Sequence, residues 1–273
     1  LRETGMTQDM QVTLAQELAD DVLTRVHPAS YIETIKQSEP TNSTARLDPD
    51  TYMSPGSLRA AKLAAGACVA AVSDILEGKT DHAFCAIRPP GHHAEVAAAM
   101  GFCIFNNVAL AAETALAHPD INRVAIVDFD VHHCNGTVDI FKDRPEVLVC
   151  SSFQENYYPY RYLDFVNDHI VNSPLPSGSD GNSFRVAVER DWLPVLDSHQ
   201  PDFLLISAGF DAHEQDPLAQ LRLQETDYTW VTAQLLSIAT DHSQGRVMST
   251  LEGGYNLSAL ASSVEAHVSA LMQ

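Results

Sequence analysis

Short apolar runs alternate with longer, alanine-rich segments along most of the chain. The short runs are rich in β-branched residues, which is typical of strands that are covered on both faces. They predict strands at residues 83–87, 123–130, 147–152, 168–172, 202–208 and 246–251. The longer segments predict helices at residues 58–76, 107–117, 136–141, 182–199, 225–241 and 257–271. This alternation indicates a three-layer α/β fold, with a mainly parallel central sheet and helices on both faces.

The first 57 residues follow this alternation least. Residues 10–15 are a candidate strand, and residues 16–26 are a candidate short helix. The stretch 41–56 is polar and punctuated by proline and glycine, so we expect a long surface loop there. The 273 residues suit a single domain. No apolar run is long enough to cross a membrane, so no membrane partner is expected.

The balance of charges limits the classes of partner. The chain has 36 Asp and Glu residues against 16 Lys and Arg residues, which makes its formal net charge −20. Direct nucleic-acid binding needs a basic surface, and this composition argues against one. The excess of acid favours solubility and leaves a cationic substrate as a further interpretation. No two of the five cysteines have CxxC spacing, which predicts reduced thiols and a cytoplasmic location.

The apolar run at 123–127 leads into an unusual polar sequence, Asp128-Phe129-Asp130-Val131-His132-His133. Alternate side chains on a strand point the same way, so Asp128, Asp130 and His132 share one direction. Two carboxylates that leave an apolar strand together are costly unless a cation lies between them. A divalent metal with Asp130 and His132 as ligands is one explanation. Solvated acids at a strand end, beside a capped helix, are the plainer alternative.

Three further predicted strands also end in polar residues that can do chemistry. Adjacent His92 and His93 suit general acid–base work, or are an accident of their loop. Asp211 is a possible third metal ligand, or a helix cap. Tyr255 follows two glycines and can donate a hydrogen bond to an oxyanion, or belongs to an ordinary turn. Because the carboxyl ends of parallel strands form one edge of a sheet, we expect these side chains to converge.

Five segments between residues 88 and 256 form an ordered series. They are RPPGHHA (88–94), GFCIFNN (101–107), VDFDVHH with NGT (127–137), SAGFDAH (207–213) and LEGGYN (251–256). Together they resemble the motifs of the zinc-dependent histone deacetylase family, which has the arginase–deacetylase fold. The first segment is similar to the class II branch, with its bacterial histone deacetylase-like amidohydrolases and acetylpolyamine amidohydrolase relatives.

The resemblance implies a role for each matching residue. The Zn²⁺ ligands would be Asp130, His132 and Asp211. The catalytic residues would be His92, His93 and Tyr255. Asp128 would support His92, Asn135 would support His93, and Gly101 and Phe102 would form the wall of the acyl channel. A structural K⁺ site would use Asp128, Asp130, His132, Ser152 and Phe153.

The implied reaction is zinc-dependent hydrolysis of an acyl-amide, with an acetylated lysine or an acetylpolyamine as substrate. His93 would act first as base and then as acid, His92 would stay cationic, and Tyr255 would polarise the acyl carbonyl. One alternative is a two-manganese ureohydrolase of similar fold, and another is a catalytically silent acyl-lysine-binding protein. An oligomer is possible. The aromatic stretch with Tyr157, Tyr158 and Tyr160 either lines the channel entrance or packs as a surface loop.

The chain also departs from the family pattern. Cys134 stands where the family usually has glycine, so its thiol either tolerates the turn or disturbs the metal site. Gln154 stands where histidine is more common, which suggests a different pocket rim. The family's first strand, with its Gly-His-Pro-Glu-like segment, is not visible. Residues 1–273 are therefore expected to form one deacetylase domain whose N-terminal strand region is incomplete.

Overall fold

A six-stranded sheet, in which every pairing is parallel, organises the computed structural model, which describes residues 1–2 and 4–273. Its strand order is β3-β8-β7-β4-β5-β6. The strands are β3 (His82–Cys85), β4 (Val124–Asp128), β5 (Val147–Gln154), β6 (Ile170–Leu175), β7 (Phe203–Ala208) and β8 (Val247–Leu251). The predicted α/β class is therefore confirmed.

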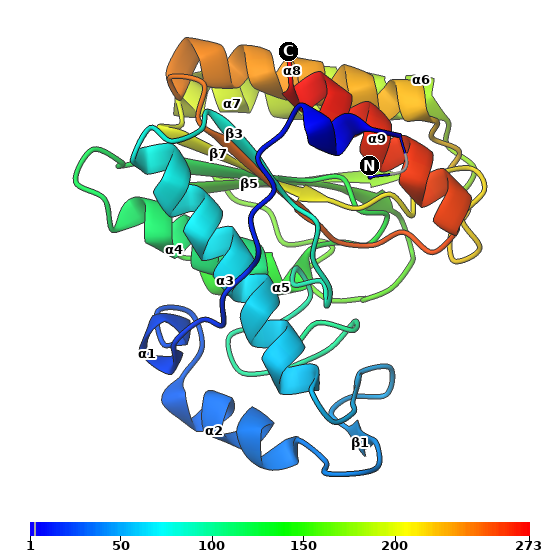
Figure 1. The fold of residues 1–273 in the computed structure, drawn as a ribbon. Helices are drawn as coiled ribbons and strands as arrows, with labels where there is room; N and C mark the ends of the chain where they lie inside the picture. Colours follow the sequence, from blue (N-terminus) through cyan, green and yellow to red (C-terminus); the bar gives the residue numbers. More distant parts are fainter. Residues whose placement is uncertain (3) are drawn as a thin grey trace.

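Helices cover both faces of this sheet (Figure 1). One layer holds α3 (Ser57–Leu76), α4 (Asn107–Leu116) and α5 (Asn135–Phe141). The other holds α6 (Gly181–Ala187), α7 (Leu193–His199), α8 (Glu225–His242) and α9 (Leu257–Leu271). Alternate residues of β4 serve the two layers: Val124 and Ile126 join one buried cluster, and Ala125 and Val127 join the other. This burial on both faces explains why the run is apolar without alternation.

The N-terminal region differs most from its prediction. Residues 10–15 form no strand, because they are largely exposed and extended without a partner strand. The predicted helix at 16–26 is reduced to the single turn of α1 (Asp20–Leu23). Figure 1 shows this segment passing over α3, where a Cβ at Gly66 would lie 1.9 Å from the Gln16 carbonyl oxygen. Packing against α3 thus determines the path of this N-terminal segment.

Other differences concern boundaries and short elements. The short helix η1 (Met6–Gln8) and the helix α2 (Ala29–Ser38) were not predicted. The expected loop at 41–56 contains a small antiparallel ribbon of β1 (Ala45–Arg46) and β2 (Tyr52–Met53). The predicted helix at 182–199 is divided by the π-helical turn Val188–Trp192 between α6 and α7. The strand predicted at 168–172 begins and ends later, as β6.

The strand register places the chemistry at one edge of the sheet. Asp128 of β4 is level with Ser207 of β7, and Ser207 is level with Thr250 of β8. The segments that follow these three neighbouring strands therefore leave the sheet together. They are the segments that carry the predicted polar side chains.

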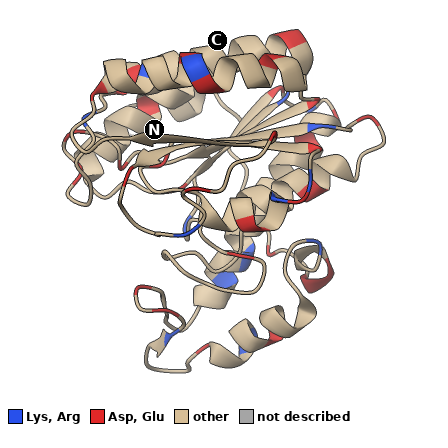
Figure 2. Cartoon of the chain, turned by 180° about the vertical axis from the view of Figure 1, so that it is seen from behind, with Lys and Arg blue, Asp and Glu red and all other residues tan. Residues whose placement is uncertain are grey.

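Two surface features bear on the expected partners. In the cartoon of Figure 2, the Lys and Arg residues are spread over several elements, with Asp and Glu residues between them. Among those same residues, no helix combines the length and the apolar character that a membrane crossing requires.

Candidate active site

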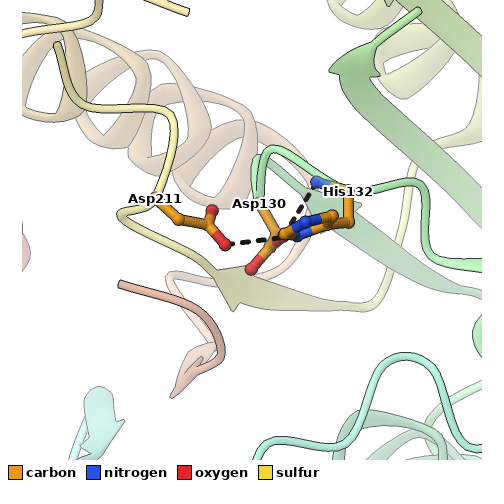
Figure 3. Close-up of side chains that lie close together, drawn as sticks. All are labelled: Asp130, His132 and Asp211. Atoms are coloured by element: carbon orange, nitrogen blue, oxygen red, sulfur yellow. Dashed lines mark hydrogen bonds and ion pairs between the residues drawn. The ribbon is translucent and has the colours of Figure 1, made fainter. Parts of the chain in front are cut away.

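Three side chains beyond the ends of β4 and β7 form a compact group. Asp130 and His132 follow β4, Asp211 follows β7, and their ligand atoms all lie within 4.8 Å of one another. His132 Nδ1 lies 2.9 Å from Asp130 Oδ1 and 3.2 Å from Asp211 Oδ2 (Figure 3). All three residues are buried. The structure thus brings together the residues that the strand ends indicated as metal ligands.

Backbone groups hold the two carboxylates in place. The Val131 N–H donates to Asp211 Oδ1 at 2.9 Å, and the Gly253 N–H donates to Asp130 Oδ2 at 2.8 Å. Asp211 Oδ2 is buried and accepts no hydrogen bond among the described residues, apart from its ion-pair contact with His132 Nδ1 at 3.2 Å. Such an oxygen is costly to bury unless a cation binds it. Aspartate oxygens and an imidazole nitrogen are ligands of divalent transition metals, so the group can hold a metal ion.

The charges in this group also favour a cation. Burial opposes protonation of His132, but its contacts with Asp130 and Asp211 outweigh burial and raise its pKa to about 10. Burial and the charge of Asp130 raise the pKa of Asp211 to about 6. The two carboxylates therefore favour a positive charge at the imidazole. A proton and a metal ion would compete for the same ring nitrogen.

The adjacent histidines lie with their ring centroids 4.0 Å apart, but their surroundings differ. His92 Nδ1 donates to Asp128 Oδ2 at 2.9 Å. Burial lowers the pKa of His92, but the charges of Asp128 and Asp130 raise it well above its usual range. His93 Nδ1 lies 2.7 Å from the neutral Asn135 Oδ1, and burial, with the charge of His92, holds its pKa well below its usual range. These surroundings thus favour the cationic form of the His92 imidazole and the neutral form of the His93 imidazole.

Glu252 joins the histidine loop to the segment that follows β8. Its side chain is fully buried, and its Oε2 accepts the Gly91 N–H at 2.7 Å and the His92 N–H at 3.1 Å. Its Oε1 accepts the Ser207 hydroxyl at 3.1 Å. Burial raises the pKa of Glu252 to about 7. We did not predict this role, although Glu252 lies within the LEGGYN segment, because nothing in a strand-end pattern shows which backbone a carboxylate will reach.

Tyr255 is held as a hydrogen-bond donor. Its backbone N–H donates to Asp216 Oδ2 at 2.7 Å. Burial and the charges of Asp211 and Asp130 raise the pKa of its hydroxyl above the usual range, so the phenol stays protonated. Its ring packs edge to face against Phe102, with centroids 6.1 Å apart.

A pocket joins these clusters. Its lining consists of Asp50, Pro90, His92, His93, Gly101, Phe102, His132, Tyr157, Tyr158, Leu218, Gly253 and Tyr255. The predicted channel residues Gly101 and Phe102 therefore border the same cavity as the candidate catalytic groups. Tyr157 and Tyr158 line the pocket, whereas the exposed Tyr160 does not.

Asp50 lines the pocket although its stretch of sequence was predicted to be a surface loop. Its Oδ1 accepts the Gly101 N–H at 3.0 Å and the Thr51 hydroxyl at 2.8 Å. The carboxylate therefore fixes the loop to the channel wall. The polar composition of the loop did not distinguish Asp50 from its exposed neighbours.

Replacing Gly101 by Ala is expected to displace the His93 ring. Gly101 has φ +57°, and a Cβ there would lie 2.1 Å from His93 Cδ2. The left-handed backbone should lower the free energy of unfolding by about 1–2 kcal/mol, and the displaced base should lower kcat by about 10²-fold. Denaturant unfolding and steady-state kinetics measure the two effects. Gly178→Ala is the matched control, since Gly178 has φ +85° but nothing within 4 Å of its Cβ position. Equal activity of the two variants would contradict the expected clash.

The match to one protein family covers almost the whole chain. The model of the histone deacetylase domain matches residues 1–271. The chain belongs to the histone deacetylase family.

Individual relatives agree with this membership. The chain is 37% identical over 260 residues to a "Histone deacetylase-like amidohydrolase" of Pseudomonas aeruginosa, covering 93% of this chain and 68% of that protein. It is 34% identical to "Histone deacetylase 10, chloroplastic" of Oryza sativa subsp. japonica, with 94% and 62% covered. The crystal structure of the HDA15 HD domain superposes with a TM-score of 0.90 at 36% identity, covering 95% of this chain and 75% of that one. The chain thus spans about two thirds of the length of these curated relatives.

Two departures from the histone deacetylase pattern have structural explanations. Cys134 has φ −80°, which any residue adopts, so the turn does not require glycine. Its thiol is buried, and burial raises its pKa well above the usual range, which keeps it protonated. Gln154 exchanges hydrogen bonds with Gln220, at 2.6 and 2.9 Å, and is not among the residues that line the pocket. Neither residue therefore replaces a metal ligand or a channel wall.

The residues of the expected K⁺ site lie at the adjacent ends of β4 and β5. Asp128 is level with Ser151, so Ser152 and Phe153 are the next two residues along β5. Asp128, Asp130, Ser152 and Phe153 are all buried. The K⁺ site itself remains a prediction.

Proposed function

We propose that this member of the histone deacetylase family is a zinc-dependent deacetylase that hydrolyses the acyl-amide of an acetylated lysine or acetylpolyamine. The observation that carries the proposal is a single pocket. It is lined by His132 of the Asp130–His132–Asp211 group, by two histidines of opposite pKa shift and by a protonated tyrosine. These are the parts that amide hydrolysis needs: a metal site, a base, an acid and a donor for the oxyanion.

The side chains divide the work of the reaction. Zinc, when bound to Asp130, His132 and Asp211, would supply a Lewis acid that acidifies water and polarises the carbonyl. Neutral His93 accepts a proton from the attacking water and then gives a proton to the leaving amine. Cationic His92 does not transfer a proton and acts through its positive charge alone. The Tyr255 hydroxyl donates to the oxygen that becomes negative as the carbonyl carbon turns tetrahedral.

Activity on acetyl-lysine peptides, longer acyl-lysines and acetylpolyamines, measured with and without a chelator, tests this function. At least one of these substrates should be hydrolysed, and treatment with a chelator should abolish turnover because it removes the Lewis acid. Adding Zn²⁺ back should restore the activity. An intact, metal-loaded protein without turnover on any of these substrates would favour the acyl-lysine-binding alternative.

The metal content separates the proposal from a two-manganese ureohydrolase. The described residues contain one group of three ligands, and the neighbouring imidazoles are already held by Asp128 and Asn135. We therefore expect one zinc ion per chain, whereas a ureohydrolase would hold two manganese ions about 3.5–4 Å apart. Elemental analysis distinguishes the two.

We also propose K⁺ as a structural ion near the ends of β4 and β5. The buried carboxylate of Asp130 and the Ser152 hydroxyl offer the oxygen ligands that hard cations prefer. The main-chain oxygens of Asp128, His132 and Phe153 complete the proposed site.

A further inference from the structure

A line of hydrogen bonds leads from His93 to the surface. His93 Nδ1 lies 2.7 Å from Asn135 Oδ1. The amide nitrogen of Asn135 donates to Glu95 Oε1 at 2.8 Å. Glu95 Oε2 in turn lies 2.8 Å from Arg161 Nη1. Glu95 is buried, whereas half of the Arg161 side chain is exposed. None of the predictions from sequence included Glu95 or Arg161.

Arg161, at the outer end of this line, determines which group donates and which accepts in each hydrogen bond. Arginine only donates and a carboxylate only accepts, so Glu95 can offer nothing but acceptors to Asn135. Asn135 must therefore turn its NH₂ group toward Glu95, which leaves its oxygen facing His93. An oxygen at that place accepts only from a protonated Nδ1. The Nε2 atom of a neutral His93 is then free of a proton, as a general base requires.

We propose that Glu95 is a positioning residue that sets the tautomer of His93 through Asn135, with Arg161 holding Glu95. The inference rests on the proposed function, because it is as a base that His93 needs a free Nε2. An asparagine alone presents either its oxygen or its nitrogen to the imidazole, since its two ends have nearly the same shape. The carboxylate behind it removes that ambiguity.

The same line connects the base to the wall of the pocket. Arg161 follows Tyr157 and Tyr158, which line the pocket, in the loop between β5 and β6. Met100 Sδ lies 3.2 Å from the Asn135 amide nitrogen and 3.7 Å from Arg161 Nη1, so it fills the space beside the line. The ion pair between Arg161 and Glu95 therefore anchors this loop beside the residue that orients the base.

Glu95→Gln is the variant that tests the role of the carboxylate. Arg161 will take the oxygen of the new amide, which turns the NH₂ group of that amide toward Asn135. Asn135 then has to present its oxygen outward and its own NH₂ group to His93, which favours the tautomer with the proton on Nε2. We expect kcat to fall by about 10–100-fold, with KM within about twofold and the metal content unchanged.

A second substitution should restore the line. In the double variant Glu95→Gln/Asn135→Asp, the introduced carboxylate accepts from both His93 and the new amide, and the amide oxygen still accepts from Arg161. Every bond is again satisfied. The new carboxylate also raises the pKa of His93, so we expect kcat to recover most of the loss at a pH high enough to leave His93 neutral. Asn135→Asp alone places a second carboxylate against Glu95 and should be less active than the double variant. This recovery is a non-additive coupling that a purely structural role would not produce.

The tautomer itself provides a readout that does not depend on turnover. Nitrogen-15 NMR of histidine-labelled, metal-loaded protein distinguishes protonated from unprotonated ring nitrogens, and the signals lost in His93→Ala assign those of His93. At a pH where His93 is neutral, the wild type and the double variant should carry the proton on Nδ1, and Glu95→Gln should move it to Nε2. Glu17→Gln removes the charge from an exposed ion pair with Arg59 and is the control, with no change expected.

The outcomes separate this inference from the proposed function. If Glu95→Gln leaves both kcat and the His93 tautomer unchanged, or if the double variant recovers neither, the inference is wrong even though the wild type hydrolyses acyl-amides. If the wild type hydrolyses none of the substrates, the proposed function fails, while the NMR result still decides the tautomer.

Discussion

Replacing Asp211 by Asn is expected to release the metal and to abolish measurable turnover. The substitution keeps the side-chain shape, and the new amide oxygen can still accept the Val131 N–H that now bonds to Oδ1 at 2.9 Å. The change therefore falls on Oδ2, the buried oxygen that accepts no hydrogen bond and faces His132 Nδ1 at 3.2 Å. An amide nitrogen in that place has no lone pair for a metal, so one of the three protein ligands is lost. Elemental analysis and the acyl-lysine assay measure the two consequences.

Asp197→Asn is the matched control for this prediction. Asp197 pairs with His242 at 3.0 Å, much as Asp211 pairs with His132, but it is exposed and is not among the residues that line the pocket. The control should keep its metal and its activity. Asp211→Asn protein that is folded, retains one metal per chain and turns over at the wild-type rate would exclude Asp211 as a ligand.

Proton release should accompany metal binding in the wild type. The pKa of His132 is raised to about 10 by Asp130 and Asp211 against the effect of burial, so His132 is protonated at neutral pH before the metal arrives. The metal needs the neutral imidazole, so its affinity should rise with pH. The two carboxylates that raise the pKa of His132 are thus the same ones that would bind the metal, which is why the loss of Asp211 is expected to release it.

The strand ends were predictable because two simple periodicities meet there. Alternate positions of a strand share a face, which placed Asp130 and His132 together, and parallel strands end at one edge, which added Asp211 from a distant segment. The observed register, in which Asp128 is level with Ser207, produces this arrangement. Apolar runs such as Val124–Asp128 were equally clear, since burial on both faces leaves no polar position within them.

Contacts between side chains of different loops were not predictable in this way. Glu95 lies in the RPPGHHAE stretch, only two residues after His93, yet its partner Asn135 belongs to the start of α5. Asp50 reaches the pocket from a loop whose composition indicated only exposure. Such pairs depend on how loops cross one another. Periodicity along the chain carries no information about these crossings.

The extended segment at 10–15 shows that a strand-like pattern along the chain does not by itself predict a strand. Its alternation of apolar and polar residues resembles a strand, but a strand needs a partner, and the edge strand β3 pairs only with β8 in the described sheet. The close approach of Gln16 to Gly66 holds this part of the chain against α3 instead. The alternation of apolar and polar residues at 10–15 therefore predicted a strand that does not form. The close packing that Gly66 allows between this part of the chain and α3 determines its path instead.

Replacing Tyr255 by Phe is expected to lower turnover by about 10²–10³-fold, the usual cost of removing one oxyanion donor. The backbone N–H of Tyr255 still donates to Asp216, and the ring keeps its edge-to-face contact with Phe102, so only the hydroxyl is lost. Because the proposed role of that hydroxyl is to donate as charge develops on the substrate oxygen, kcat should fall far more than KM rises. Steady-state kinetics with the best substrate of the panel measures this difference.

Tyr160→Phe is the appropriate control, because Tyr160 belongs to the aromatic loop but is exposed and does not line the pocket. It should leave kcat unchanged, and both variants should keep the wild-type metal content, since neither hydroxyl belongs to the Asp130–His132–Asp211 group. Because burial and the nearby carboxylates keep the Tyr255 phenol protonated, raising the pH toward 9 should not remove its contribution in the wild type. A Tyr255→Phe enzyme as fast as the wild type would mean that another group donates to the oxyanion, and Tyr255 would then serve only as part of the channel wall.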